Sequence, residues 1–363
     1  MRGDVVKNNF RILAINPGST STKIAVYDNE ELLFEQVVRY SNEELALFES
    51  IIGQYEFRKN GILQILKDRG ISIESLDAIV GRGGLLKPIA GGTYAVNDSM
   101  IEALRLAERG EHASNIGGVI AREIADKLGI PSFIVDPVVV DELTDIARVS
   151  GLPGYDRVSI FHALNQKAVA RKISKELGKS YDEANLIIAH MGGGVTVGVH
   201  QNGEVIDVND GLYGEGPFSP ERTGGLPNGH LIDLCFSGKY TPGEVRKIIS
   251  SKGGLVAYLG TNDGREVGKM IENGDGKAKL VYSAMAYQIA KEIAADAAVL
   301  FGKVDAIVLT GGLAYDKVLV EMIADRVCFI ADVRIVPGEH EMIALTEGAL
   351  RVLRGEEKVK EYK

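Results

Sequence analysis

A polar turn between two apolar segments is the first place in this sequence where side chains and backbone could perform chemistry. Residues 12–15 (Ile-Leu-Ala-Ile) enter the turn, residues 16–23 (Asn-Pro-Gly-Ser-Thr-Ser-Thr-Lys) form it, and residues 24–27 (Ile-Ala-Val-Tyr) leave it. Both flanks are typical of β-strands, so the segment predicts a hairpin. Its tip would present backbone N–H groups, hydroxyls and a lysine, which suit a polyphosphate. A plain polar β-turn is the alternative, whereas a Walker loop would need a second glycine before the lysine and a following helix.

A second segment repeats this pattern. Residues 186–191 are apolar apart from His190, the turn is Gly192-Gly193-Gly194, and residues 195–200 return as a predicted strand. Each hairpin is followed by a short polar turn and a third predicted strand, at residues 32–38 and 205–208. The repeat indicates an internal duplication, in which two similar α/β lobes would hold a nucleotide between their phosphate-type turns. This organisation resembles the actin, Hsp70 and sugar-kinase superfamily, which implies two ribonuclease H-like lobes with a nucleotide cleft between them.

Candidate catalytic side chains follow predicted strands in the first half of the chain. Arg82 lies between glycines after the predicted strand 76–80, and Asp136 follows the predicted strand 131–135. Side chains at the carboxyl ends of strands in an open α/β sheet reach the crevice where ligands bind. A surface arginine in a flexible turn is the alternative for Arg82. His162, near the start of a predicted helix, is a further candidate, although a lone histidine on a helix is more often a packed core residue.

The second half of the chain adds glycine-rich candidates. Residues 211–229 follow no regular pattern and contain Arg222, and a long loop inside a compact domain is usually functional. Gly311 and Gly312 connect a predicted strand to a predicted helix, which would place bare N–H groups at the positive end of that helix. Glu341 lies in the polar turn that follows the predicted strand 334–336.

Some polar residues have a simpler, structural interpretation. Thr241 and Glu244 form a capping-box sequence at the start of a predicted helix. Asp263 precedes another predicted helix and is suited to be its N-cap. Whether Asp263 and His112 also belong to a functional site stays open.

Composition limits the classes of partner. The chain has 363 residues, which favours about two domains, and its 41 Lys and Arg against 50 Asp and Glu give a net charge of −9. An acidic balance argues against nucleic acid or an anionic membrane as the main partner. No apolar run is long enough for a membrane span, and the first residues lack the apolar segment of an export signal, so a cytoplasmic protein is expected. The two cysteines, Cys235 and Cys328, are expected in the core.

Taken together, three motifs resemble those of the acetokinase family and, within it, of its butyrate kinase group. They are residues 15–23, residues 189–194 (Ala-His-Met-Gly-Gly-Gly) and residues 309–312 (Leu-Thr-Gly-Gly), in the order and rough spacing of the family. The resemblance extends over essentially the whole chain. It implies reversible transfer of the γ-phosphoryl group of ATP to a short-chain carboxylate, butyrate or a branched analogue, with Mg²⁺ and with release of ADP and an acyl phosphate.

The same resemblance implies roles for individual residues. Arg82 and Arg222 would flank the carboxylate and the transferring phosphorus, and His162 and His190 would donate to phosphoryl oxygens. Asn16 would face the metal, Asp136 and Glu341 would hold it directly or through water, and Asp136 would also belong to the catalytic set. Backbone and side chains that would bind the nucleotide and its phosphates are Ser19, Ser21, Lys23, Gly192, Gly193, Gly194, Gly311 and Gly312.

Departures from the family separate this chain from acetate kinases. Acetate kinases carry asparagine where Gly193 stands, and their arginine loop differs from residues 218–225. The expected lobes are residues 1–150 plus 342–363 and a nucleotide-binding lobe of residues 151–341, and the resemblance implies a homo-oligomer. A sugar kinase of the same fold, with Asp136 as its base, and an actin- or Hsp70-like ATPase are the alternatives.

Overall fold

The computed structural model describes residues 9–363 and divides the chain into two compact units. The first contains the chain up to Val140 together with His340–Lys363, and the second contains Asp141–Glu339. The chain therefore changes unit at 140/141 and 339/340, whereas the sequence placed its boundaries at 150/151 and 341/342.

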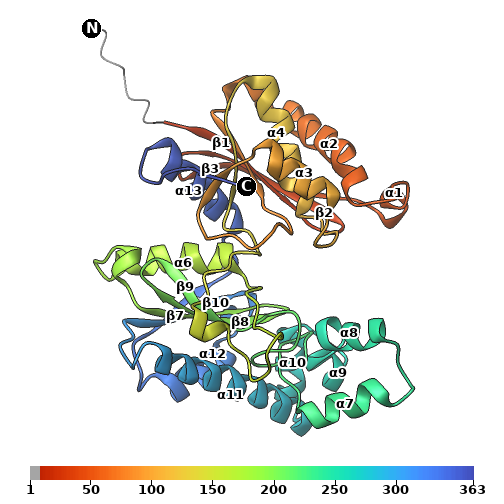
Figure 1. The fold of residues 1–363 in the computed structure, drawn as a ribbon, viewed down its shortest axis with the longest axis vertical. Helices are drawn as coiled ribbons and strands as arrows, with labels where there is room; N and C mark the ends of the chain where they lie inside the picture. The colour runs from red at the N-terminus through yellow and green to blue at the C-terminus, as the bar shows by residue number, and fades with distance from the viewer. Residues whose placement is uncertain (1–8) are drawn as a thin grey trace. The chain divides into compact units, whose positions relative to one another are not determined.

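The first unit is built on a seven-stranded mixed sheet (Figure 1). The strands, in spatial order, are β3 (Glu31–Arg39), β2 (Ser21–Asp28), β1 (Arg11–Pro17), β4 (Ala78–Arg82), β6 (Ser132–Val135), β5 (Thr93–Ala95) and β12 (Lys360–Glu361). Strands β1, β2 and β3 form an antiparallel meander, and β4 and β6 continue the sheet parallel to β1. The predicted hairpin of residues 12–27 is confirmed, with Pro17 paired to Thr22 at its last rung.

Helices cover this sheet because its strands direct apolar side chains to both of its faces. The helices of the unit are α1 (Asn42–Leu45), α2 (Tyr55–Asp68), α3 (Asp98–Leu106), α4 (Asn115–Leu128) and α13 (Glu341–Leu353), with 3₁₀ turns η1 (Ile52–Gln54) and η2 (Ile73–Ser75). Leu13 and Ile15 pack with residues of α2 and α4, such as Ile62. Helix α13 packs on β1, β4 and β6, and Gly348 allows it to lie directly against Val135.

The second unit contains a five-stranded sheet of the order β9 (Glu204–Val208), β8 (Val195–Gln201), β7 (Leu186–Met191), β10 (Ala306–Gly311) and β11 (Val333–Pro337). Again a meander of β7, β8 and β9 is antiparallel, and β10 and β11 run parallel to β7. The order and directions repeat those of β3-β2-β1-β4-β6. Both sheets thus share one five-stranded frame, as the repeated hairpin pattern predicted.

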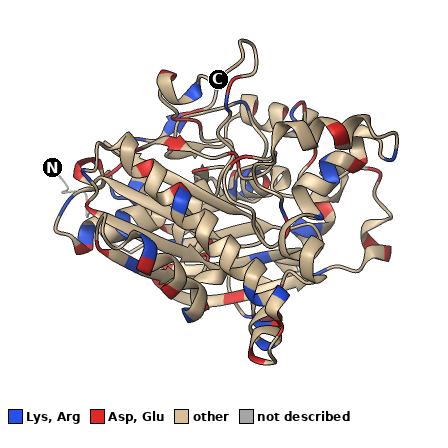
Figure 2. Ribbon diagram, turned by 90° about the horizontal axis from the view of Figure 1, so that it is seen from below, with Lys and Arg blue, Asp and Glu red and all other residues tan. Residues whose placement is uncertain are grey.

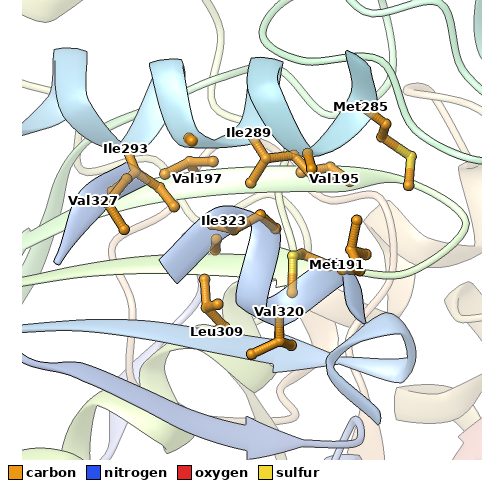
Figure 3. Packing of buried hydrophobic residues seen from close by; sticks show 14 of the residues in the cluster. Met191, Val195, Val197, Met285, Ile289, Ile293, Leu309, Val320, Ile323 and Val327 are labelled. Carbon is orange, nitrogen blue, oxygen red and sulfur yellow. The ribbon is translucent and has the colours of Figure 1, made fainter. Parts of the chain in front are cut away.

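Odd- and even-numbered residues of β7 and β10 face different helices, since side chains alternate along a strand. Ile187 and Leu309 pack with α11 and α12, and Figure 3 shows Ile289 and Ile323 closing this core. Ile188 and Val308 pack with α6 instead. The helices of the unit are α5 (Asp145–Arg148), α6 (Ala163–Glu176), α7 (Asn228–Phe236), α8 (Pro242–Ser251), α9 (Gly254–Leu259), α10 (Gly264–Glu272), α11 (Gly276–Val299) and α12 (Lys317–Val327), with 3₁₀ turns η3 (Tyr181–Glu183) and η4 (Gly312–Tyr315).

Local capping predictions hold, whereas one burial prediction is wrong. Thr241 and Glu244 form the capping box of α8, and Asp263 caps α10 by accepting a hydrogen bond from the Arg265 backbone N–H. Cys235 and Cys328 are exposed, because Cys235 lies near the end of α7, a helix with no buried residue, and Cys328 ends α12.

Within residues 9–363, no helix is both long and apolar enough to cross a membrane. Acidic and basic residues are interspersed along the helices (Figure 2).

Candidate functional site

The turn between β1 and β2 presents its hydroxyl-bearing residues outward. The Gly18 N–H donates to the Ser21 carbonyl at 2.7 Å and closes the turn, which leaves Ser19 exposed and Ser21 half-buried. Lys23 lies inside β2, paired in register with Asn16, and its Nζ contacts the Glu35 carboxylate of β3 at 2.9 Å. Lys23, which the sequence placed at the turn, therefore forms an ion pair with Glu35 of the neighbouring strand β3.

Sequence reasoning missed Arg58, which holds this turn from inside the unit. Arg58 is fully buried on α2, and its guanidinium donates to the carbonyl oxygens of Gly18 at 2.7 Å, Ser19 at 2.8 Å and Ser21 at 2.9 Å. It also donates to the Gln54 side chain and lies over the Tyr40 ring. The turn's carbonyl groups and the buried Thr22 hydroxyl therefore face this cation, whereas Ser19 and Thr20 are exposed.

Three predicted residues of the first unit meet at one point. The Arg82 guanidinium at the end of β4 contacts one carboxylate oxygen of Glu341 at 2.9 Å. Asn16 of β1 donates from Nδ2 to the other carboxylate oxygen at 2.5 Å, and its Oδ1 lies 3.4 Å from Arg82. Glu341 begins α13 after His340, whose left-handed backbone (φ 44°) turns the chain into the helix. The parallel strands β1 and β4 thus bring their carboxyl ends to the first turn of α13.

Asp136 and His112 occupy more enclosed positions in the same unit. Asp136 follows β6 with φ 37° and is 1% exposed, and its Oδ1 accepts a hydrogen bond from the Gly92 N–H at 2.6 Å. The metal-related role of Asp136 stays a prediction. The His112 Nδ1 lies 2.7 Å from the Ser114 hydroxyl, and burial together with the charge of Arg82 lowers the pKa of His112.

In the second unit, His162 and His190 are brought together as a stacked pair. Their ring centroids are 3.8 Å apart and their planes are 11° from parallel. His162 precedes α6 and contacts the Thr196 hydroxyl through Nδ1 at 2.9 Å, while His190 on β7 contacts the Asn165 Oδ1 through Nδ1 at 2.8 Å. The packed-core alternative for His162 does not hold, since the ring is half-buried against a second polar ring.

The glycine turn after β7 is packed against the loop that carries Arg222. A Cβ at Gly194 would overlap an Arg222 guanidinium nitrogen, so glycine is required there. Gly193 accepts at its carbonyl from the Ser219 hydroxyl at 2.7 Å, and its Cα faces the Glu221 carboxylate. Arg222 also donates to the Gly211 carbonyl, and burial lowers its pKa. The sequence had assigned this space to phosphate groups, and in the structure Arg222 and Glu221 line it.

The second glycine pair connects β10 to η4. Gly311 has φ 89°, and a Cβ there would overlap the Met191 carbonyl oxygen, so the close approach of β7 explains this glycine. The space around Gly312 is open within 4 Å. Gly312 begins the 3₁₀ turn η4, so the predicted helix does not start at the glycine pair: α12 begins at Lys317, and the Asp316 side chain caps its N-terminus.

The cluster of Asn16, Arg82 and Glu341 also bears on the predicted magnesium. Within residues 9–363, no group of three or more His, Cys, Asp or Glu side chains is arranged to hold a metal ion. Mg²⁺ usually binds through one or two carboxylates and completes its shell with water and substrate phosphates. One carboxylate (Glu341) beside one amide oxygen (Asn16) fits that mode of binding.

Strand order and the doubled hairpin define the class of this protein, an α/β fold of the actin, Hsp70 and sugar-kinase type. The model of the Acetokinase family matches residues 156–330, which include His162, His190 and Arg222.

Solved structures give the same class. The acetate kinase of Porphyromonas gingivalis superposes with a TM-score of 0.77 at 21% identity, over 94% of this chain and 100% of that one. A propionate kinase from Francisella tularensis gives 0.73 at 17% identity, over 93% and 98%. The ROK hexokinase of Thermus thermophilus gives 0.50 at 16% identity, over 94% and 99%. The predicted fold class is confirmed.

Proposed function

We propose that this protein is an ATP-dependent kinase of short-chain carboxylates, which reversibly forms an acyl phosphate and ADP. The observation that carries the proposal is the character of the candidate groups, which are cations and hydrogen-bond donors. Arg82 is held by Glu341 and Asn16, Arg222 lies against Gly194, and the two histidines are stacked. The family match over residues 156–330 and the solved acetate and propionate kinases support the same reaction class.

This set of groups suits a carboxylate acceptor. A carboxylate is already ionised at pH 7 and needs no general base. Its attack on a phosphoryl group is opposed by repulsion between two anions, and fixed positive charge relieves that repulsion in the transition state. A sugar kinase would need a carboxylate to accept a hydroxyl proton. The candidate for that role, Asp136, is 1% exposed and accepts a backbone hydrogen bond, which makes the sugar reaction the weaker proposal.

Within the proposed reaction, Arg82 and Arg222 stabilise charge on the acceptor and the transferring group. Ser19, Ser21, Gly192, Gly193 and Gly194 bind the nucleotide phosphates, and Gly311 and Gly312 approach the adenosine side. Mg²⁺, when bound, would neutralise charge on the phosphates, and Glu341 with Asn16 would hold it. Asp136, buried behind β6, would support this region rather than contact the acceptor.

We further propose that the acceptor is longer than acetate, with butyrate or a branched analogue preferred. The argument rests on the departure at Gly193, where acetate kinases carry asparagine. A Cβ at Gly193 would lie 3.2 Å from the Glu221 carboxylate, and Glu221 also accepts from the Asn262 side chain at 2.7 Å. An asparagine at this position would therefore require the Glu221 carboxylate to shift, so Gly193 and Glu221 fit each other in this chain.

Trapping the acyl phosphate with hydroxylamine tests both proposals. We expect hydroxamate from butyrate and isobutyrate, with ADP formation dependent on the carboxylate, and no comparable ADP release with glucose or with water alone. One methylene in a pocket is worth about 10–200-fold in kcat/KM, so butyrate should exceed acetate clearly. A butyrate-to-acetate ratio near or below one would refute the chain-length proposal. Phosphorylation of sugars without any hydroxamate would refute the carboxylate kinase itself.

A further inference from the structure

A continuous chain of hydrogen-bonded polar side chains runs from Tyr181 to His162, and its middle members are buried. The Tyr181 hydroxyl lies 2.8 Å from the His200 Nδ1, and the His200 Nε2 lies 3.1 Å from the Gln166 Oε1. The Gln166 Nε2 lies 2.9 Å from the Thr196 hydroxyl, which contacts the His162 Nδ1. Gln166 and His200 are both fully buried, so these contacts do not exchange with solvent.

The direction of each hydrogen bond follows from a backbone carbonyl. The Gln166 side-chain nitrogen also lies 3.1 Å from the Thr196 carbonyl oxygen, which can only accept, so this end of the amide is the NH₂ group. The Gln166 oxygen must then accept from His200, whose burial beside Lys167 and Arg171 lowers its pKa and keeps it neutral. The Thr196 hydroxyl accepts from Gln166, and its own proton is then available to the His162 Nδ1. With that donation, the ring proton of His162 lies on Nε2.

The same reasoning gives His190 the opposite tautomer. The Asn165 Nδ2 donates to the Glu339 carbonyl oxygen at 2.6 Å, so the Asn165 Oδ1 is the atom that faces the His190 Nδ1. That oxygen accepts, and the His190 proton lies on Nδ1. A neutral His190 then carries no proton on Nε2, whereas a neutral His162 presents an Nε2–H group.

We propose that Tyr181, His200, Gln166 and Thr196 are positioning residues that hold His162 in the Nε2–H tautomer, so that His162 is the histidine that donates to a phosphoryl oxygen while uncharged. Its stacked neighbour His190 donates through Nε2 only when it carries an extra proton, and two stacked imidazolium rings would repel each other. The inference rests on the proposed phosphoryl transfer for its use and on the hydrogen bonds alone for the tautomer.

Gln166→Glu keeps the shape of the side chain and reverses the two hydrogen bonds that join it to Thr196 and Thr196 to His162, although its new oxygen also faces the Thr196 carbonyl oxygen. The carboxylate that this substitution introduces would accept from both His200 and the Thr196 hydroxyl, which turns that hydroxyl away and makes it an acceptor for a proton on the His162 Nδ1. Loss of one correctly placed donor lowers kcat by about 10²–10³-fold, and KM for the carboxylate substrate should change far less. Thr196→Val, which removes the hydroxyl without adding a charge, should lower kcat less because the ring then samples both tautomers.

Long-range ¹H–¹⁵N spectra of the full chain read the tautomer directly, with the His162 signals assigned by their loss in His162→Gln. Wild type should show a protonated Nε2 and an unprotonated Nδ1 for His162, and Gln166→Glu should exchange the two signals. Ser174→Ala is the matched control, since it removes a buried side-chain hydrogen bond (2.8 Å to the Ala170 carbonyl) from the same helix outside the chain of polar groups. It should leave both the spectrum and kcat unchanged.

Three results would overturn the inference. They are a proton on the His162 Nδ1 in wild type, a spectrum unchanged by Gln166→Glu in a folded protein, and equal losses of kcat in Gln166→Glu and Ser174→Ala. The proposed function fails separately, if wild type forms no acyl hydroxamate while the spectrum still shows the expected tautomer. That outcome would support the predicted hydrogen bonds and refute the proposal that they prepare His162 for phosphoryl transfer.

Discussion

Arg58 offers the sharpest test of how the first unit is built, because one buried side chain organises a whole turn. Its guanidinium donates to the carbonyls of Gly18, Ser19 and Ser21 and to the Gln54 side chain. Arg58→Met keeps a flexible, largely apolar stem and removes the guanidinium, and with it every one of these donors and the contact with the Tyr40 ring. The turn would lose the cation that holds its carbonyl groups inward.

The magnitude follows from which acceptors remain buried. Ser21 keeps the hydrogen bond from the Gly18 N–H, and exposed Ser19 can reach water, which leaves the Gly18 carbonyl and Gln54 without donors. An orphaned buried polar group costs about 1–3 kcal/mol, and removing a buried charge offsets part of this, so we expect a loss of about 2–4 kcal/mol. For a unit of this size each kcal/mol corresponds to about 2–4 °C, which gives a fall in Tm of about 4–16 °C.

Thermal and urea unfolding of Arg58→Met, Arg58→Lys and Arg11→Met would measure the effect. Arg11 pairs with Asp28 at 2.7 Å on the same sheet with both side chains partly exposed, and ion pairs near the surface contribute less than about 1 kcal/mol. Arg58→Lys should be intermediate, since an ammonium cannot span three carbonyls as the planar guanidinium does. An Arg58→Met variant as stable as Arg11→Met would refute the argument that the turn depends on this residue.

Other perturbations give distinct outcomes. Lys167 and Glu142 form a buried ion pair at 2.7 Å, so Lys167→Met should cost about 3–5 kcal/mol by urea unfolding, and adding Glu142→Gln should recover part of it. Burial lowers the pKa of His200 well below its ordinary value, so the unfolded chain binds the extra proton and the free energy of unfolding should fall below about pH 6.5, by up to ~1.4 kcal/mol per pH unit. His200→Gln should flatten that slope, and an unchanged slope would refute the assignment. Arg82→Ala should lower kcat with butyrate by about 10²–10⁴ while nucleotide affinity measured by calorimetry changes little, and near-normal kcat would exclude a role for Arg82 in transfer.

Strand and turn signals could be predicted from the sequence because they are local. Alternating and continuous apolar runs identified β1, β2, β7 and β8, and glycine-rich turns identified their connections. The capping box of α8 and the N-cap of α10 were also correct, since each depends on residues within one helical turn. Gly61 does not interrupt α2, because the helix continues through it with Ile62 buried beside it.

Residues that act from a distance gave no such signal. Arg58 lies in a helix segment rich in polar residues, where an arginine is typical of a solvent-facing position. Gln166 is equally inconspicuous on α6, and the only local hint is Gly198 inside β8, where a Cβ would overlap the Gln166 Oε1. A glycine within a strand marks the close approach of another group, but the sequence does not say which group. The pairing of segments far apart in the chain must be known before either role can be seen.

The five-stranded frame that both units share shows why side chains at equivalent positions make different contacts in the two units. Asn16 near the end of β1 pairs with Lys23 of β2, and His190 near the end of β7 pairs with Thr196 of β8. Lys23 and Thr196 therefore occupy the same place in the two meanders. Thr196 faces a helix that supplies Gln166, and it becomes the link to His162, whereas Lys23 faces the edge strand β3 and contacts Glu35. Duplication thus supplies the positions at the strand ends, and the helix or strand packed beside each one decides which groups its side chain contacts.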